Sequence, residues 1–172
     1  MHELAGLVHA IPDFPRPGVL FRDVSPLLAS ACAFARCVDL LAEPWQGSGV
    51  QAVGGIEARG FIFGAALAHK LQAGFVPLRK PGKLPPPVLG VDYKLEYGCD
   101  RLEAQHVAFK SGERVLLVDD VLATGGTLEA AAALIALVGA ELVGASVVIE
   151  LVALQGRHRW HADRPLHGLL RY

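Results

Sequence analysis

The stretch Val115–Thr127 (VLLVDDVLATGGT) decides the fold class of this 172-residue chain. Residues 115–118 are all apolar, as is typical of a buried strand, and they run into two acidic residues and a glycine-rich turn. A nearly all-apolar helix is predicted next, over Thr127–Val138, and it ends before Gly139. Because ligands bind at the carboxyl ends of the strands in open parallel sheets, a site is expected at this junction.

The residue types at the junction suit a sugar phosphate. The glycines of Thr124–Thr127 let backbone amides approach an anion, its threonines add hydroxyl groups, and the following helix points its positive N-terminal end to the same place. Asp119 and Asp120 would repel a phosphate, so we expect them to accept hydrogen bonds from ribose hydroxyls. The alternative is a capped turn with merely exposed acidic residues. The Walker motif GxxxxGK[ST] is absent, which disfavours an ordinary nucleoside triphosphatase.

Apolar runs and helical patterns alternate along the rest of the chain. They predict an α/β fold with a mainly parallel sheet flanked by helices, in a single domain over residues 1–172. Further strands are expected over residues 50–56, 75–78 and 142–151, and further helices over residues 30–43 and 60–71. The proline-rich stretch 80–98 predicts a long irregular loop, of a kind that is usually functional or mobile. The tail after Gly156 has no convincing metal-ligand spacing and is interpreted as surface.

The composition is typical of a globular intracellular protein, with 52% hydrophobic and 19% charged residues. A net charge of −1 provides no broad basic surface, so neither nucleic acid nor a membrane is expected as a partner. The three cysteines lack zinc-ligand spacing, which favours a reducing, cytoplasmic compartment. Neither a signal-peptide pattern nor an apolar run long enough to span a membrane is present.

The run Val115–Thr127 resembles the 5-phosphoribosyl 1-diphosphate signature of the type I phosphoribosyltransferase family. The resemblance implies the fold of that family, with a small base-binding hood from about residues 1–30 plus a C-terminal segment, and a mobile catalytic loop over about residues 80–98. It implies that Asp119 and Asp120 bind the ribose hydroxyls. The implied 5′-phosphate loop consists of Ala123, Thr124, Gly125, Gly126 and Thr127.

Two segments resemble the base-binding parts of the adenine-specific members of the family. By its resemblance, Phe14–Asp23 (FPRPGVLFRD) implies that Phe21 stacks on the purine while the backbone of Leu20 and Arg22 reads its edge. Taken alone, Phe21 is more often a core residue. Glu150 and Leu151 align with a family position at which leucine covers the other face of adenine. An apolar sandwich of this kind suits a flat base.

Gly55–Phe61 (GIEARGF) resembles the pyrophosphate loop of the family. The resemblance implies a strained turn at Glu57–Ala58 and places Arg59 near the leaving group. Some relatives carry aspartate and serine at these two turn positions; the backbone role survives that change, but a serine hydroxyl contact does not. The alternative for Arg59 is a surface ion pair.

Arg79–Lys83 (RKPGK), followed by Tyr93–Gly98 (YKLEYG), resembles the mobile catalytic loop of adenine-specific members. Its basic residues suit a highly charged diphosphate, and they are Arg79, Lys80 and Lys83. In the family some of these residues reach the neighbouring subunit's site, which implies a homodimer. The alternative is a solvated run of charge. The proline run at 85–87 departs from the family pattern, and we expect it to stiffen the loop.

Glu96, beside Tyr97, is the residue that the resemblance places at proton transfer. Adenine must lose or relocate a ring proton when it attacks C1 of the ribose, and a positioned carboxylate assists such a step by about 10²–10⁴-fold. Without the resemblance, Glu96 is interpreted as an exposed loop charge.

Together the segments imply a pentosyl-transferring glycosyltransferase of purine salvage that converts adenine and 5-phospho-α-D-ribose 1-diphosphate to AMP and diphosphate. Mg²⁺ is implied as cofactor, held mainly by substrate oxygens rather than by the protein. One alternative is a family member for another base, such as xanthine or guanine. The other is a regulator that keeps the sugar-phosphate site and binds nucleic acid, which needs a basic surface or an added module that the sequence does not show.

Overall fold

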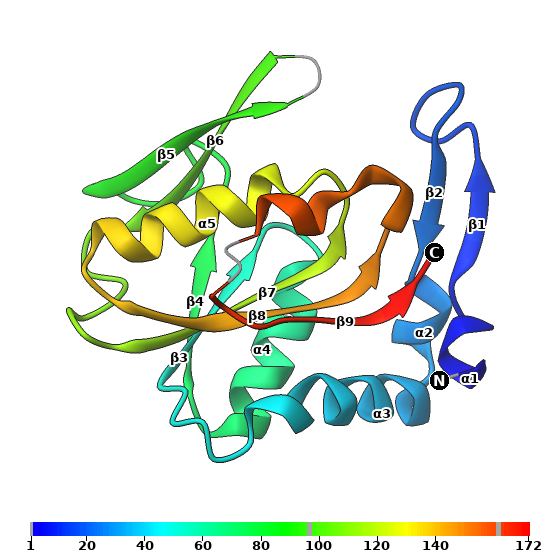
Figure 1. Ribbon diagram of the computed structural model, residues 1–172, viewed down its shortest axis with the longest axis horizontal. Coiled ribbons are helices and arrows are strands. Elements are labelled where there is room, and N and C mark those ends of the chain that lie inside the picture. Colours follow the sequence, from blue (N-terminus) through cyan, green and yellow to red (C-terminus); the bar gives the residue numbers. More distant parts are fainter. Residues whose placement is uncertain (1, 96–97, 161–162) are drawn as a thin grey trace.

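The computed structural model describes residues 2–95, 98–160 and 163–172, and its centre is a five-stranded parallel sheet with the strand order β4-β3-β7-β8-β9 (Figure 1). The strands are β3 (Ala52–Ile56), β4 (Gly74–Leu78), β7 (Arg114–Leu122), β8 (Glu141–Glu150) and β9 (Leu166–Arg171). The predicted α/β class with a mainly parallel sheet is confirmed. Strand β7 is longer than predicted, because its pairing with β8 continues past the two acidic residues.

Helices cover both faces of the sheet because successive residues of a strand point to opposite faces. In β7, Leu116 and Val118 belong to a core cluster with α3 (Ala31–Ala42) and α4 (Gly60–Leu71). The alternate residues of the same strand belong to a second cluster with α5 (Gly126–Leu137). Figure 1 shows α5 on one side of the sheet and α3 and α4 on the other.

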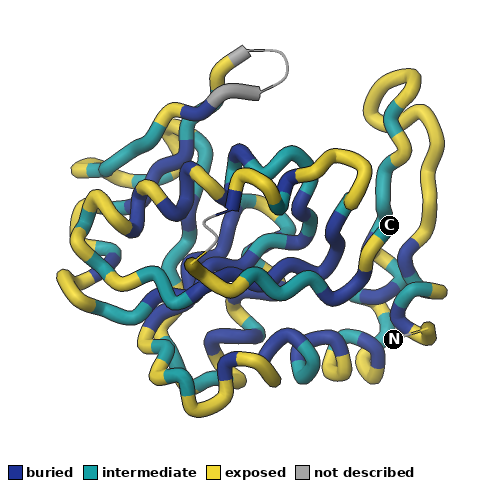
Figure 2. The backbone as a smooth tube through the Cα atoms, in the orientation of Figure 1, coloured by how far each residue is buried: buried dark blue, intermediate teal, exposed yellow. Residues whose placement is uncertain are grey.

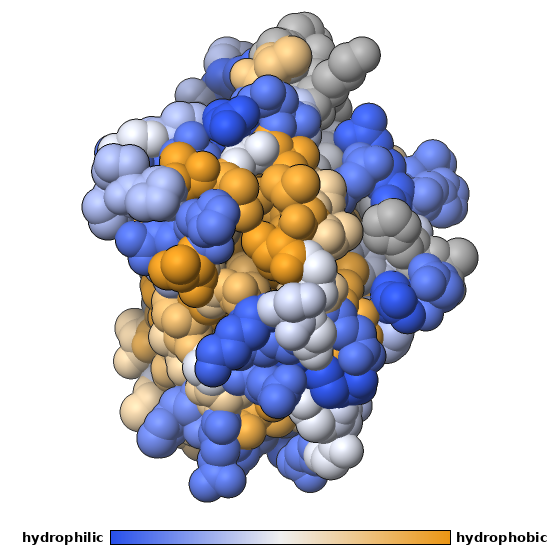
Figure 3. Space-filling model, turned by 90° about the vertical axis from the view of Figure 1, so that its left-hand side faces the viewer, coloured by the Kyte–Doolittle hydropathy of each residue, from blue (hydrophilic) through white to orange (hydrophobic). Residues whose placement is uncertain are grey.

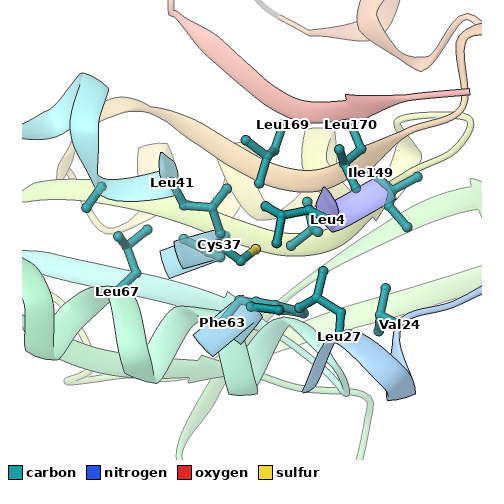
Figure 4. Packing of buried hydrophobic residues seen from close by; sticks show 14 of the residues in the cluster. Leu4, Val24, Leu27, Cys37, Leu41, Phe63, Leu67, Ile149, Leu169 and Leu170 are labelled. Carbon is teal, nitrogen blue, oxygen red and sulfur yellow. The ribbon is translucent and has the colours of Figure 1, made fainter. Parts of the chain in front are cut away.

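The first cluster also ties the N-terminal segment to the sheet. Leu4 of α1 (His2–Ala5) and Leu27 of α2 (Ser25–Ala29) pack with Cys37 and Phe63 (Figure 4). Burial raises the pKa of the Cys37 thiol to about 12, so this cysteine is a packing residue and not a nucleophile. Figure 2 shows that the buried residues follow the central strands, whereas exposed residues gather in the connections.

The N-terminal residues form a small antiparallel hairpin outside the main sheet. It consists of β1 (His9–Pro12) and β2 (Leu20–Asp23). Figure 1 shows the C-terminus beside β2. The Arg22 guanidinium lies 4.1 Å from the centre of the Tyr172 ring, a cation–π contact that joins the hairpin to the end of the chain.

The stretch 80–98 is not irregular throughout. Strand β5 (Val88–Leu95) pairs antiparallel with β6 (Gly98–Gln105), so the prediction of a long loop is wrong over residues 88–95. The prolines of this stretch precede Val88, and the residues after them form a β-ladder, because Tyr93 and Leu102 are buried in the cluster with α5. Strand β6 of the hairpin is joined to the end of β4 by an isolated antiparallel bridge between Glu103 and Arg79.

The C-terminal tail is not mere surface, contrary to the prediction. Strand β9 completes the central sheet, and Leu169 and Leu170 are buried in the first core cluster. Short 3-10 helices precede it at η2 (Val152–Leu154) and η3 (Gly156–Arg159), and a further one, η1 (Glu43–Trp45), follows α3. Among the described residues, no helix has the length and apolar character needed to cross a membrane.

Candidate active site at the carboxyl ends of the central strands

A cavity of about 270 Å³ opens where β3 and β7 end, as the parallel-sheet rule predicts. Its lining comes from the β3–α4 turn, from the residue two positions after β4, from the β7–α5 junction, and from Val147 of β8. Eight of the predicted site residues line it, namely Arg59, Lys80, Asp119, Asp120, Ala123, Thr124, Gly125 and Thr127. Gly126 begins α5 directly beside them.

The acidic pair lies in the last part of β7, and the two carboxylates have different partners. Asp120 is buried, and its carboxylate accepts a hydrogen bond from Arg59 Nε at 2.5 Å. A carboxylate oxygen of Asp119 accepts a hydrogen bond from the Asp120 amide at 2.8 Å. Burial, followed by the negative charge of Asp120, raises the pKa of Asp119 well above its usual value. The pair therefore offers to the cavity one carboxylate that is paired with Arg59 and one carboxyl group whose pKa is raised.

Arg59 connects the acidic pair to the N-terminal hairpin. Its guanidinium carbon lies 4.9 Å from the centre of the Phe21 ring, while its Nε binds Asp120. The ring of Phe14 meets Phe21 edge-on, with centroids 5.1 Å apart. Arg59 does form an ion pair and its side chain is 39% exposed, but the partner carboxylate is buried and lines the cavity. Phe21 is half-buried, and Leu20 is exposed at the start of β2.

The turn after β3 holds the basic residues that follow β4. The Glu57 carboxylate accepts hydrogen bonds from Arg79 Nη2 at 3.2 Å and from the Lys80 amide at 2.8 Å. Burial opposes ionisation of Glu57, but these hydrogen bonds outweigh it and hold its pKa below the usual value. The Glu57–Ala58 peptide bond is cis. Lys83 is exposed, and its carbonyl accepts a hydrogen bond from Arg79 at 3.1 Å.

The phosphate turn packs backbone to backbone against a glycine that sequence reasoning missed. Gly125 adopts φ 85° and caps α5. A Cβ on Gly125 would overlap the Gly156 carbonyl, and a Cβ on Gly156 would overlap the Ala123 carbonyl. Gly156 begins η3, whose next residue, Arg157, binds Glu150. The position of the phosphate turn thus depends on two facing glycines that lie 31 residues apart in the chain (125 and 156).

Glu150 is a structural counter-ion in this part of the molecule. The residue is 3% exposed, and its carboxylate accepts hydrogen bonds from Arg157 Nε at 2.9 Å and Nη2 at 2.7 Å, with Arg171 at 3.5 Å. The hydrogen bonds from Arg157 hold the pKa of Glu150 below its usual value. A direct contact of Glu150 with a substrate stays a prediction, as does that of the half-buried Leu151.

Seven other predicted residues that the structure describes do not line the cavity. Those outside its walls are Leu20, Phe21, Arg22, Arg79, Lys83, Glu150 and Leu151. Glu96 and Tyr97 lie outside the described residues, so the predicted proton-transfer group is not placed.

Comparison with known proteins matches this architecture to one family. The family model described as phosphoribosyl transferase domain matches residues 39–165. An adenine phosphoribosyltransferase of Xanthomonas campestris pv. campestris (strain B100) is 55% identical over 98% of this chain and 90% of its own. The crystal structure of adenine phosphoribosyltransferase from Rhodothermus marinus DSM 4252 is similar with a TM-score of 0.96 and 46% identity, over 99% of this chain and 97% of that one.

A third relative carries ligands. The adenine phosphoribosyltransferase of Saccharomyces cerevisiae, crystallised with adenine and D-2,5-dideoxy-2,5-imino-altritol 1,6-bisphosphate, is 38% identical with a TM-score of 0.92, over 98% of this chain and 97% of that one. The family match covers most of the chain, and the relatives extend it to nearly the whole length. The chain therefore belongs to the phosphoribosyltransferase family and, within it, to the adenine phosphoribosyltransferases.

Proposed function

We propose that this chain transfers the phosphoribosyl group of 5-phospho-α-D-ribose 1-diphosphate, hereafter the ribose substrate, to adenine in the cytoplasm, as a step of purine salvage. The bond between C1 of the ribose and the diphosphate oxygen breaks, a bond from a ring nitrogen of adenine to C1 forms, and the ring proton leaves. The observation that carries this proposal is a cavity lined together by the acidic pair, the glycine-rich turn, Arg59 and Lys80. It offers separate surroundings for a sugar, a phosphate and a diphosphate.

The sugar phosphate is proposed to lie across the end of β7. The amides of the turn and the N-terminus of α5 suit the 5′-phosphate, since they present unpaired N–H groups and the positive end of the helix dipole. The carboxyls of Asp119 and Asp120 suit the ribose hydroxyls, which need acceptors rather than donors. Arg59, already bound to Asp120, holds that carboxylate in place.

The diphosphate is proposed to lie toward the ends of β3 and β4. Lys80 lines the cavity there, and Glu57 holds both Lys80 and Arg79 through hydrogen bonds. The charges of these basic residues neutralise the leaving group as it departs, which favours an oxocarbenium-like sugar in the transition state. The segment 80–98 is proposed to exclude water from that sugar, because water would otherwise hydrolyse it. Glu96 is proposed to take the ring proton of adenine, with Tyr97 beside it.

The base is proposed to bind against Phe21. The ring of Phe21 is fixed by Phe14 on one side and by Arg59 on another, so it is a rigid aromatic face next to the cavity. The backbone of Leu20 and Arg22 and the side chain of Leu151 complete the proposed base site. The relative from Saccharomyces cerevisiae, which was crystallised with adenine, supports adenine as the base.

Mg²⁺ is proposed as the cofactor, held mainly by substrate oxygens. Among the described residues, no group of three or more His, Cys, Asp or Glu side chains is arranged to hold a metal ion. The carboxylates that line the cavity are Glu57, Asp119 and Asp120, and their oxygen atoms suit a hard cation whose other ligands would come from the substrate and from water. When bound, the ion neutralises charge on the diphosphate.

A homodimer is proposed through the surface next to Arg79. The Arg79 guanidinium carbon lies 5.7 Å from the centre of the Phe61 ring, and Phe61 meets Phe75 edge-on at 6.0 Å, so an apolar surface continues from the basic residues. Ile62, on the same helix as Phe61, is 43% exposed. Ile62→Asp should yield monomers by analytical ultracentrifugation. Val107→Asp, at a more exposed apolar residue elsewhere, is the matched control and should stay dimeric.

The experiment that tests the proposed activity is turnover of a panel of bases with the ribose substrate and Mg²⁺. Adenine should give AMP with kcat/KM at least about 10³-fold above those for guanine, hypoxanthine and xanthine. A site built to hydrogen-bond one edge of a base disfavours a base whose donors and acceptors are inverted. The discrimination expected from such a site is about 10⁴-fold. Inactivity with adenine and turnover of another base would contradict the proposal.

A further inference from the structure

A hydrogen-bonded cluster joins the β5–β6 hairpin to both ends of the cavity. Lys80 Nζ donates to the Asp100 carboxylate and to the Tyr93 hydroxyl at 2.5 Å. The Tyr93 hydroxyl donates to Asp100 at 3.1 Å and accepts from the Thr127 hydroxyl at 3.4 Å. Tyr93 and Asp100 face each other across the hairpin, in register. The cluster therefore connects the predicted diphosphate residue to the first turn of α5.

The geometry leaves the Lys80 ammonium with donor capacity for a ligand. An ammonium group has three N–H donors, and Asp100 and Tyr93 accept from it at two. The Lys80 side chain keeps about a third of its surface exposed, and the residue lines the cavity. A flexible side chain held at two of its three donors loses much less freedom when the third binds an anion.

The hairpin is itself anchored, so it can hold these partners in place. The Arg79 amide donates to the Glu103 carbonyl at 2.8 Å, and the Glu103 amide donates back at 2.7 Å. Tyr93 is buried, with its ring packed in the cluster with α5. The phenol and the carboxylate are therefore fixed points against which a long lysine side chain is oriented.

We propose that Asp100 and Tyr93 are positioning residues for the reaction: they hold the Lys80 ammonium at the diphosphate end of the cavity, and Tyr93 links that end to Thr127 at the phosphate end. The inference rests on the proposed role of Lys80 at the diphosphate. It predicts that Asp100 acts through Lys80 on the affinities for diphosphate and for the ribose substrate. It predicts no effect on adenine affinity.

The experiment compares the full-length chain with Asp100→Asn, Tyr93→Phe, Lys80→Met and the double variant Lys80→Met/Asp100→Asn. Asp92→Asn is the matched control, since Asp92 lies next to Tyr93 in β5 and pairs with Arg101 at 3.0 Å instead of with Lys80. The measurements are the Kd for inorganic diphosphate with Mg²⁺ by calorimetry, the KM for each substrate, kcat, and the Tm of each variant.

Asp100→Asn should raise both the Kd for diphosphate and the KM for the ribose substrate by about tenfold, the usual effect of losing one charged hydrogen bond, with the KM for adenine unchanged within about twofold. Tyr93→Phe should have a smaller effect in the same direction, and Asp92→Asn none. In the Lys80→Met background, Asp100→Asn should add nothing, because the partner is gone.

Three results would overturn the inference. The first is an unchanged diphosphate Kd in Asp100→Asn together with a raised Kd in Lys80→Met, which would leave the proposed role of Lys80 intact. The second is a parallel rise of both KM values with a lower Tm, which is the mark of a merely structural residue. The third is an unchanged Kd in Lys80→Met itself, which would remove the proposed role of Lys80 as well.

Discussion

The contact between Gly156 and the phosphate turn leaves no room for a side chain. In Gly156→Ala, the new methyl group would lie 2.9 Å from the Gly125 nitrogen and 3.1 Å from the Ala123 carbonyl carbon, and it would overlap the Ala123 oxygen. Ordinary van der Waals contacts are about 3.4–4 Å. To bring the contact with the Ala123 oxygen into this range, the two backbone segments must separate by about 1 Å or more.

The phosphate turn is the segment that should move. On the other side, η3 is held by Arg157, which binds the buried Glu150 through two nitrogens and donates to the Leu166 carbonyl at 2.8 Å. A misplacement of about 1 Å in a positioning group costs about 10²-fold in rate. We therefore expect kcat/KM for the ribose substrate to fall by about 10²-fold. Overpacking should also lower the stability by about 1–3 kcal/mol.

The assay is initial-rate kinetics with each substrate varied in turn, together with thermal unfolding. The KM for adenine should change little, since Phe21 lies on another element. Gly74→Ala is the matched control, because a Cβ there meets its nearest atom at an ordinary 3.7 Å. If Gly156→Ala kept kcat/KM for the ribose substrate within about twofold of the parent, the packing argument would be refuted.

Three further predictions concern single side chains. Phe21→Ala should raise the KM for adenine by about 5- to 150-fold, the range expected for a lost base–aromatic stack of about 1–3 kcal/mol, with the Kd for diphosphate unchanged in calorimetry. Glu96→Gln should lower kcat by about 10²–10⁴-fold with little change in either KM, and an unaltered kcat in steady-state kinetics would remove Glu96 as the proton-transfer group. Arg157→Gln should flatten the acid limb of the Tm–pH profile. Arg157 lowers the pKa of Glu150 below 4.5, so the ion pair stabilises the fold above that pH. This contribution is lost as the pH falls through the lowered pKa. An acid limb in the variant identical to that of the parent would contradict the stabilising role of the ion pair.

Much of the fold could be predicted because its signals are local. The helix expected over residues 60–71 is α4, with the same ends, since an apolar pattern starts after a glycine turn and stops before polar residues. Helix α5 begins one residue earlier than predicted, at Gly126. The contiguous run from Asp119 to Thr127 could likewise be assigned to one site, because a strand, a turn and a helix start follow one another without interruption.

What the sequence did not predict depends on contacts between distant residues. Strand β9 is short and has His167 and Gly168 near its start, and it becomes a strand because β8 offers a free edge. Gly156 resembles any loop glycine until it is placed against Ala123 and Gly125. Asp100 has no local motif, and its link to Lys80 exists because the β5–β6 hairpin folds back on the end of β4. Patterns in the sequence are short-range, and these contacts are not.

The distribution of apolar residues over the surface is another feature that the sequence did not predict. Figure 3 shows one face of the molecule with a continuous apolar area bordered by hydrophilic residues. Leu137, which ends α5, and Val107, which follows β6, are strongly exposed. Helical periodicity does not predict the exposure of Leu137, because α5 is apolar almost all round. Only the packed structure decides which residues of this helix stay exposed.

The most direct measurement is AMP formation from adenine and the ribose substrate by the parent chain and by the double variant Asp119→Asn/Asp120→Asn. The parent should produce AMP and diphosphate in equal amounts. The variant should lose at least about tenfold in kcat/KM for the ribose substrate, because each lost charged hydrogen bond costs about 1.5–3 kcal/mol. Equal kcat/KM in the two proteins, or no AMP from the parent, would contradict the assignment of Val115–Thr127 as the sugar-phosphate site.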